Sequence, residues 1–189
     1  MEELTKEILK NLGNKHTKVA LKQDFKGNYY SYITDTIYIA NNCNEPQKEV
    51  IKNNINKKAS KLVVVCHECI HSNQSKVMHI LNTILSNLSI VLTVISIVIG
   101  VVWTSALWFD ISAIGIIIAS IIVRLILELD AINGSIKLAL DVVSKGLVEG
   151  VANTDIQEGA RFIEKYKYLV LFKMILDKIV FLILLLVIK

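Results

Sequence analysis

The chain has 189 residues, of which 53% are hydrophobic, with one proline and a formal net charge of +4. This length predicts one domain, and so apolar a composition is unusual for a water-soluble protein. The lysines are not gathered on one helix beside an aromatic platform, so we expect no nucleic-acid partner. The three cysteines lack the spacing of a secreted scaffold, which indicates a reducing compartment.

The first 61 residues predict a cytoplasmic region made of a helix and a β-hairpin. Leu4, Ile8 and Leu12 recur at helical spacing, and Gly13 stands where a helix C-cap belongs. Two β-prone runs, NYYSYI and TIYIA, then flank Thr34-Asp35 and predict two or three short strands. The N-terminus lacks the basic and apolar regions of a signal peptide, so we expect it to stay in the cytoplasm.

Residues 62–189 predict a membrane-embedded core with two to three transmembrane helices. No Asp, Glu, Lys or Arg occurs between Lys76 and Asp110, and such a run can cross the roughly 30 Å hydrocarbon core as a helix. We expect spans at about 81–103 and 107–126, with the first continuing from the preceding helix. A polar helical region follows over 129–165. The apolar segment 168–188 is the third candidate span.

The distribution of basic residues predicts the orientation of the first two spans. Residues 1–80 carry 12 Lys and Arg, the turn 104–110 carries none, and residues 124–167 carry six. The positive-inside rule therefore places both flanking regions on the cytoplasmic side of a multi-pass protein of the cell membrane.

The chemistry of the sequence centres on an HExxH motif, His67-Glu68-Cys69-Ile70-His71. Positions i and i+4 of a helix differ by about 40° of rotation, so both imidazoles project from one face and can share one Zn²⁺. Glu68 lies beside them and can accept a proton from the attacking water and pass it to the leaving amine. A coincidental polar patch, with Glu68 paired to a lysine, is the alternative interpretation of the motif.

A catalytic zinc needs a third protein ligand, and Glu128 is the candidate. Glu128 follows the second predicted span, and an even number of crossings returns the chain to the membrane face of His71. An interfacial carboxylate paired with Arg124 is the alternative role for Glu128. Cys66 and Cys69 form a C-x-x-C, which is either a redox or metal pair or two small packing residues.

Several segments together resemble the YugP-type zinc-dependent membrane metallopeptidases, which are gluzincin-like. KLVVVCHECIHSNQ is similar to the family's active helix, and LELDAINGS is similar to its EFDAS segment. EGARFIEKYK is similar to its closing helix. The resemblance implies that Glu128 is the third zinc ligand and that Asp130 supports a ligand histidine from the second shell.

The chain also departs from that family. We expect no opening transmembrane helix in residues 1–61, and the arginines that follow EFDAS in the family are replaced by Asn133 and Gly134. The loss of these arginines favours an alternative function as a catalytically silent membrane scaffold or regulatory relative. A membrane protein with no metal is the remaining alternative.

The sequence therefore predicts a mainly α membrane protein with a zincin-like active helix and a small N-terminal β element. We expect a zinc metalloendopeptidase in which Glu68 is catalytic and His67, His71 and Glu128 bind Zn²⁺. The site should face the cytoplasm close to the lipid bilayer. Its substrate should be a polypeptide, membrane-associated or partly unfolded.

Overall fold

The structure is a computed structural model of the whole chain. It describes residues 1–23, 27–41, 51–102, 107–148, 150–158, 161, 168, 172–173, 175–176, 178–180 and 183. The chain forms two compact units, the first made of Met1–Gln74 and Leu129–Tyr166 and the second of Ser75–Glu128 and Lys167–Lys189. Residues 61 and 62, where we placed the predicted domain boundary, are consecutive residues of one helix.

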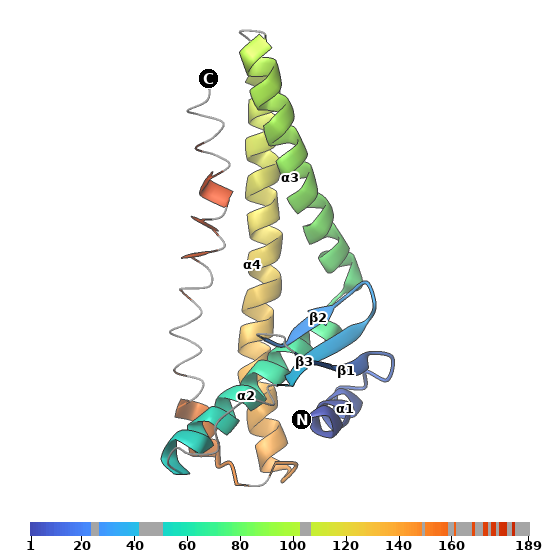
Figure 1. Cartoon of the computed structure of the whole chain (residues 1–189), viewed down its shortest axis with the longest axis vertical. Coiled ribbons are helices and arrows are strands. Elements are labelled where there is room, and N and C mark those ends of the chain that lie inside the picture. The colour runs from blue at the N-terminus through green and yellow to red at the C-terminus, as the bar shows by residue number, and fades with distance from the viewer. Residues whose placement is uncertain are drawn as a thin grey trace. The chain divides into compact units, whose positions relative to one another are not determined.

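The first unit begins with a helix and a three-stranded sheet (Figure 1). Helix α1 spans Glu2–Asn11, and Gly13 follows it with a φ of 72°, as the glycine C-cap predicts. The strands are β1 (Lys18–Gln23), β2 (Tyr29–Ser31) and β3 (Thr36–Asn41). The hairpin of β2 and β3 is confirmed. Strand β1 pairs in parallel with β3, so the order is β1-β3-β2 and β2 lies at an edge.

Helix α2 (Ile51–Asn73) carries the HExxH motif and packs on this sheet. Its apolar residues recur at helical spacing, so one stripe of the helix is buried. The stripe packs with inner-face residues of β3 and with α1 and the C-terminal part of α4 (Leu107–Ser144). The buried members of this core include Ile8, Ile37, Leu62, Cys66, Cys69 and Val142.

The predicted continuation of the active helix into the first span is wrong. Helix α2 ends at Asn73, and α3 (Lys76–Val102) begins after the two-residue break Gln74-Ser75. The backbone N–H of Gln74 still bonds the carbonyl of Ile70 at 3.0 Å, so the last turn of α2 is closed. Asn73 and Ser75 are weak helix formers, and this stretch tolerates such a break.

Helix α4 is longer than the predicted second span. It runs without interruption from Leu107 to Ser144, so the span expected at 107–126 and the start of the polar helical region are one helix. The sequence offers no proline to end the helix near residue 126, and the two glycines of α4, Gly115 and Gly134, lie far apart. The continuous helix carries Glu128 and Asp130 in its middle.

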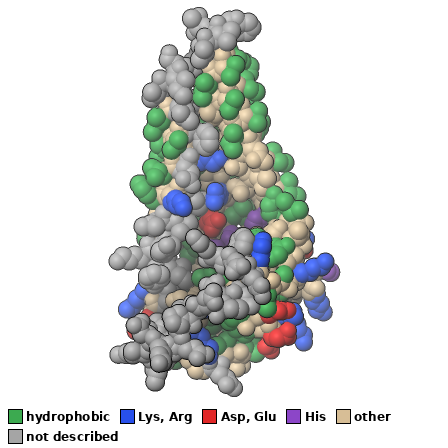
Figure 2. Space-filling model, in the orientation of Figure 1, with side chains coloured by type: hydrophobic (Ala, Val, Ile, Leu, Met, Phe, Trp, Pro, Cys, Tyr) green, Lys and Arg blue, Asp and Glu red, His purple; other side chains and the backbone are tan. Residues whose placement is uncertain are grey.

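Two of the described helices, α3 and α4, are long and apolar enough to cross a membrane. The apolar stretches are Lys76–Ile99 of α3 and Trp108–Ser144 of α4, and few of their residues are buried. Figure 2 shows hydrophobic side chains over the surface of these helices. Side chains of this kind are stable on a surface where lipid rather than water surrounds them. Most of the third predicted span, 168–188, lies outside the described residues.

Inside the second unit, α3 and α4 contact each other through apolar and small polar residues. Ala113 and Ile117 of α4 are fully buried against a set of partly buried residues that includes Leu92 and Ile97. Ser96 of α3 is also fully buried and donates a hydrogen bond to the Asp110 carboxylate of α4. Small and hydroxylated residues at such contacts let helix backbones approach closely.

Candidate metal centre

The two histidines of the HExxH motif project from one face of α2. Their ring Nε2 atoms lie 3.1 Å apart, and the rings meet edge to face with centroids 4.5 Å apart. The 40° offset between positions i and i+4 produces this arrangement, as the sequence predicts. In a tetrahedral zinc site with bonds of 2.0–2.1 Å, ligand atoms are about 3.3 Å apart, so the histidine pair needs little rearrangement to bind a metal.

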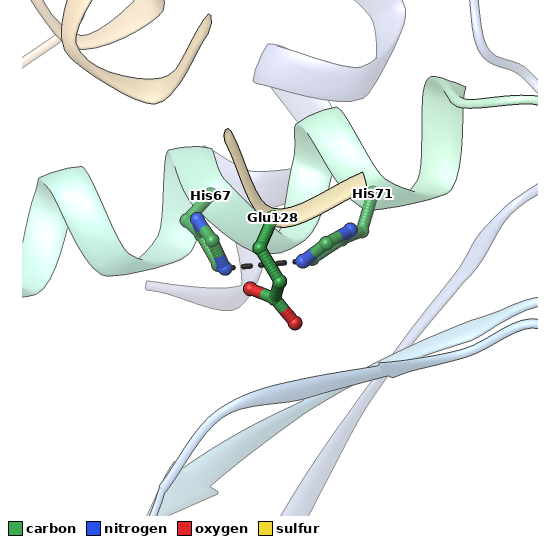
Figure 3. A group of neighbouring side chains, drawn as sticks. All are labelled: His67, His71 and Glu128. Carbon is green, nitrogen blue, oxygen red and sulfur yellow. Dashed lines mark hydrogen bonds between the residues drawn. The ribbon is translucent and has the colours of Figure 1, made fainter. Parts of the chain in front are cut away.

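Glu128 completes a group of three that could hold a metal ion. Ligand atoms of His67, His71 and Glu128 all lie within 4.8 Å of one another, and all three residues are partly buried (Figure 3). Glu128 directly precedes Leu129, where the first unit resumes along the same helix. Its position therefore follows from how the next turns of α4 pack on α2.

A glycine allows that packing. A Cβ atom placed on Gly134 of α4 would meet the Ile70 side chain of α2 at 3.1 Å, which is tighter than ordinary van der Waals contact. Gly134 is six residues after Glu128, which is about 1.7 turns or about 9 Å along the helix, so the close approach of the two helices lies near the metal group. From the sequence we interpreted Gly134 only as a lost family arginine, and its packing role depends on a neighbour 64 positions away.

Gln74 links a histidine of the group to Asp130. Its side-chain Oε1 lies 2.8 Å from Nδ1 of His71, and its Nε2 donates to the Asp130 carboxylate at 2.8 Å. A carboxylate only accepts hydrogen bonds here, so the amide nitrogen faces Asp130 and the amide oxygen faces His71. Nδ1 of His71 is then the protonated nitrogen, and Nε2 presents its lone pair to the metal position.

Two hydrogen bonds therefore connect Asp130 to His71 through the side chain of Gln74. The resemblance implied a supporting carboxylate at Asp130, and the structure places Gln74 between it and the histidine. We did not identify Gln74 from the sequence. Gln74 is three residues after His71, and an α-helix returns to the same face after three or four residues. This spacing was the signal in the sequence that could have identified Gln74 as a partner of His71.

Glu68 is 8% exposed and receives a backbone hydrogen bond from the sheet. The N–H of Tyr30, on edge strand β2, donates to Oε2 of Glu68 at 2.7 Å. In an antiparallel edge strand every second N–H points away from the partner strand, which leaves it available to a helix side chain. The bond fixes the position of one carboxylate oxygen of Glu68, the residue that follows His67 on α2.

Comparison of the chain with protein-family models, with curated proteins and with solved structures found no match in any of the three. The chemistry of the residues themselves therefore carries the functional conclusion.

The ligand set itself indicates which metal fits. Two imidazole nitrogens and one carboxylate form a borderline N/O set that suits Zn²⁺, whereas Ca²⁺ and Mg²⁺ prefer oxygen ligands alone. Three protein ligands leave a fourth position open, which is the arrangement of catalytic rather than structural zinc sites. The three residues could therefore hold a metal ion, and their donor atoms are of the kind that Zn²⁺ accepts.

The two cysteines of the C-x-x-C are fully buried in the core. Burial raises the pKa of the Cys66 thiol from its ordinary value of 9.0 to about 12 and also raises the pKa of Cys69. Protonated thiols are poor nucleophiles and poor metal ligands. The structure therefore favours the packing role for both cysteines.

Proposed function

We propose that the chain is a multi-pass integral-membrane zinc metallopeptidase that hydrolyses peptide bonds. The observation that carries the proposal is the grouping of His67, His71 and Glu128, with the buried Glu68 next to His67 along α2. This is the residue set that zinc-dependent peptide hydrolysis requires: three ligands, an open position and an adjacent base.

Each residue has a separate chemical task in this proposal. His67, His71 and Glu128 would hold the ion, which would supply a Lewis acid that polarises a carbonyl and lowers the pKa of bound water toward neutrality. Glu68 takes a proton from the attacking water and delivers it to the leaving amine. Tyr30 and Gln74 orient Glu68 and His71 through the hydrogen bonds described above.

The apolar helices support a membrane location for this site. Two helices satisfy the length and composition of membrane spans, and the basic residues are concentrated on both sides of the pair in the sequence. By the positive-inside rule, the site faces the cytoplasm. A substrate that reaches it is a polypeptide associated with the membrane or partly unfolded near it.

Two substitutions test the proposal. Glu68→Gln keeps the shape of the side chain but removes its basicity, so hydrolysis of a peptide should fall by about 10²–10⁴-fold with zinc content unchanged. Glu128→Gln should lose zinc as well as rate, because it weakens a ligand. His79→Ala, on α3 outside the metal group, is the matched control for both measurements.

The results distinguish the proposal from its alternatives. Equal zinc in the wild type and in a His67→Ala, His71→Ala double variant would show that HECIH is a coincidence. Zinc bound through this group without turnover of any peptide would instead favour the catalytically silent scaffold. Full activity of Glu68→Gln would exclude the proposed mechanism even with the metal in place.

A further inference from the structure

The last turn of α2 carries His71, and the backbone carbonyls of this turn need hydrogen-bond partners. An α-helix leaves its last four C=O groups without a bond inside the helix. The N–H of Gln74 bonds the carbonyl of Ile70 at 3.0 Å and that of His71 at 3.2 Å. The carbonyl of Ser72 follows, and Ser72 is 6% exposed, so water has little access to this residue. The structure supplies a partner for this carbonyl from another part of the chain.

That partner is the side chain of Asn14. Its Nδ2 donates to the carbonyl oxygen of Ser72 at 3.0 Å and to the Ser72 hydroxyl at 3.3 Å. The hydroxyl donates in turn to the carbonyl of Cys69, one turn earlier in α2, at 2.8 Å. Asn14 therefore caps the C-terminal end of α2, although Asn14 and Ser72 are 58 positions apart in the sequence.

The backbone of Asn14 is fixed by the end of α1. The N–H of Asn14 bonds the carbonyl of Leu9 at 2.9 Å, and the N–H of Gly13 bonds that of Lys10 at 3.0 Å. These two bonds and the φ of 72° at Gly13 form a Schellman motif, in which a left-handed glycine ends the helix. Leu9 is buried in the core that α1 shares with α2. The packing of α1 on this core therefore sets the position of Asn14.

Two backbone donors set the orientation of the Asn14 side chain. Its Oδ1 accepts from the N–H of His16 at 3.3 Å and from the N–H of Thr17 at 3.2 Å. Asparagine commonly forms such turns with the residues that follow it. The amide nitrogen cannot accept from these donors, so Oδ1 faces them and Nδ2 faces Ser72. An aspartate at position 14 would keep the turn and lose the cap.

We propose that Asn14 is a positioning residue for the metal site: it caps α2 and thereby keeps the turn that carries His71 helical. Helix ends fray unless their terminal groups have partners. In a frayed turn His71 would leave its place beside His67, and Gln74 would leave its place 2.8 Å from Nδ1 of His71. The apparent affinity for a metal falls with the fraction of molecules in which the site is formed. The inference rests on the proposed function through its zinc site, and not on peptide hydrolysis.

Asn14→Asp in the full-length chain tests the cap. The aspartate still accepts from His16 and Thr17 but cannot donate to Ser72. Hydrogen exchange of the metal-free protein should show the Gln74 amide exchanging about tenfold faster, because the last turn of α2 opens more often. Competition with a chelator should show zinc bound about five- to tenfold more weakly. Ser72→Ala keeps the backbone carbonyl, so it should stay close to the wild type in both measurements.

Ile8→Val is the control for a general loss of stability. Ile8 is fully buried, and the substitution removes one methyl group from the core that positions α1. It should lower the midpoint of thermal unfolding, while zinc affinity and the exchange rate of the Gln74 amide stay close to those of the wild type.

Two results would overturn the proposal. The first is zinc affinity and Gln74 exchange in Asn14→Asp that equal those of the wild type. The second is a loss in Ile8→Val as large as that in Asn14→Asp, which would report general stability only. A wild type that binds no zinc would instead overturn the proposed function, and the exchange rate at Gln74 would still decide whether Asn14 caps α2.

Discussion

The backbone N–H of Tyr30 and the side chain of Glu68 are 38 positions apart in the sequence and are joined by a 2.7 Å hydrogen bond. The bond connects edge strand β2 to the carboxylate that we propose as the general base. Strand β2 is thus part of the proposed site as well as part of the sheet.

Tyr30→Pro tests this bond, because proline lacks the N–H and is tolerated on an edge strand where that group does not join the ladder. We expect hydrolysis to fall about 10-fold or more, in line with the loss of a hydrogen bond to a charged group. Tyr30→Ala removes the side chain and keeps the N–H, so its rate of hydrolysis should fall much less than that of Tyr30→Pro. Equal rates for the two variants, with intact folding by circular dichroism, would contradict an orienting role.

Gln74→Leu should weaken zinc binding by about 10–100-fold, because the His71 ring loses the acceptor that fixes its tautomer. Competition with a chelator measures the affinity, and Asn73→Ala, an exposed neighbour, is the control. Imidazole nitrogen NMR of the metal-free protein should show His71 protonated at Nδ1 in the wild type and not in Gln74→Leu.

A double variant separates positioning from general damage at this site. In Gln74→Glu combined with Asp130→Asn, the new carboxylate still accepts from His71 and receives a hydrogen bond from the new amide. Zinc affinity should recover relative to Gln74→Leu. Failure to recover, together with an unchanged tautomer in the single variant, would show that the chain of hydrogen bonds does not position the ligand.

Gly134→Leu should destabilise the first unit by about 1–3 kcal/mol, the usual cost of overpacking a tight contact. The added side chain meets Ile70, whose atoms lie only 3.1 Å from the position that a Cβ atom would occupy at residue 134. Gly134→Ala combined with Ile70→Ala should be closer to the wild type than Gly134→Ala alone. Urea unfolding measures the stability, and additive effects of the two alanines would argue against direct contact between the positions.

Cys66 and Cys69 should resist thiol reagents in the folded protein, tested in a Cys43→Ser background. Burial raises the pKa of Cys66 from 9.0 to about 12. Between these two pH values the thiol stays protonated in the folded protein, whereas it ionises in the unfolded chain. The free energy of unfolding should therefore be highest below about pH 9 and fall as the pH rises toward 12, because the unfolded chain releases protons first. Rapid labelling at pH 8 without denaturant would contradict this.

Local patterns were sufficient for part of this protein. The apolar runs predict α3 and the start of α4, because a charge-free stretch needs only its own hydrogen bonds to be stable in lipid. The i, i+4 spacing of His67 and His71 predicts their meeting, since helical geometry alone sets it. The β2–β3 hairpin also followed from two adjacent β-prone runs around a turn, where Asp35 takes a φ of 48°.

Other features depend on distant parts of the chain coming together. Three contacts join residues that are far apart in the sequence, so neither helical nor strand spacing predicts them. They are the parallel pairing of β1 with β3, the bond from Tyr30 to Glu68 and the bond from Gln74 to Asp130. The placement of Glu128 beside the histidines depends on α4 approaching α2 closely at Gly134. Helical spacing acts within a few residues, whereas the separation of two helices is set by the volumes of the side chains between them, and only the packed structure decides those.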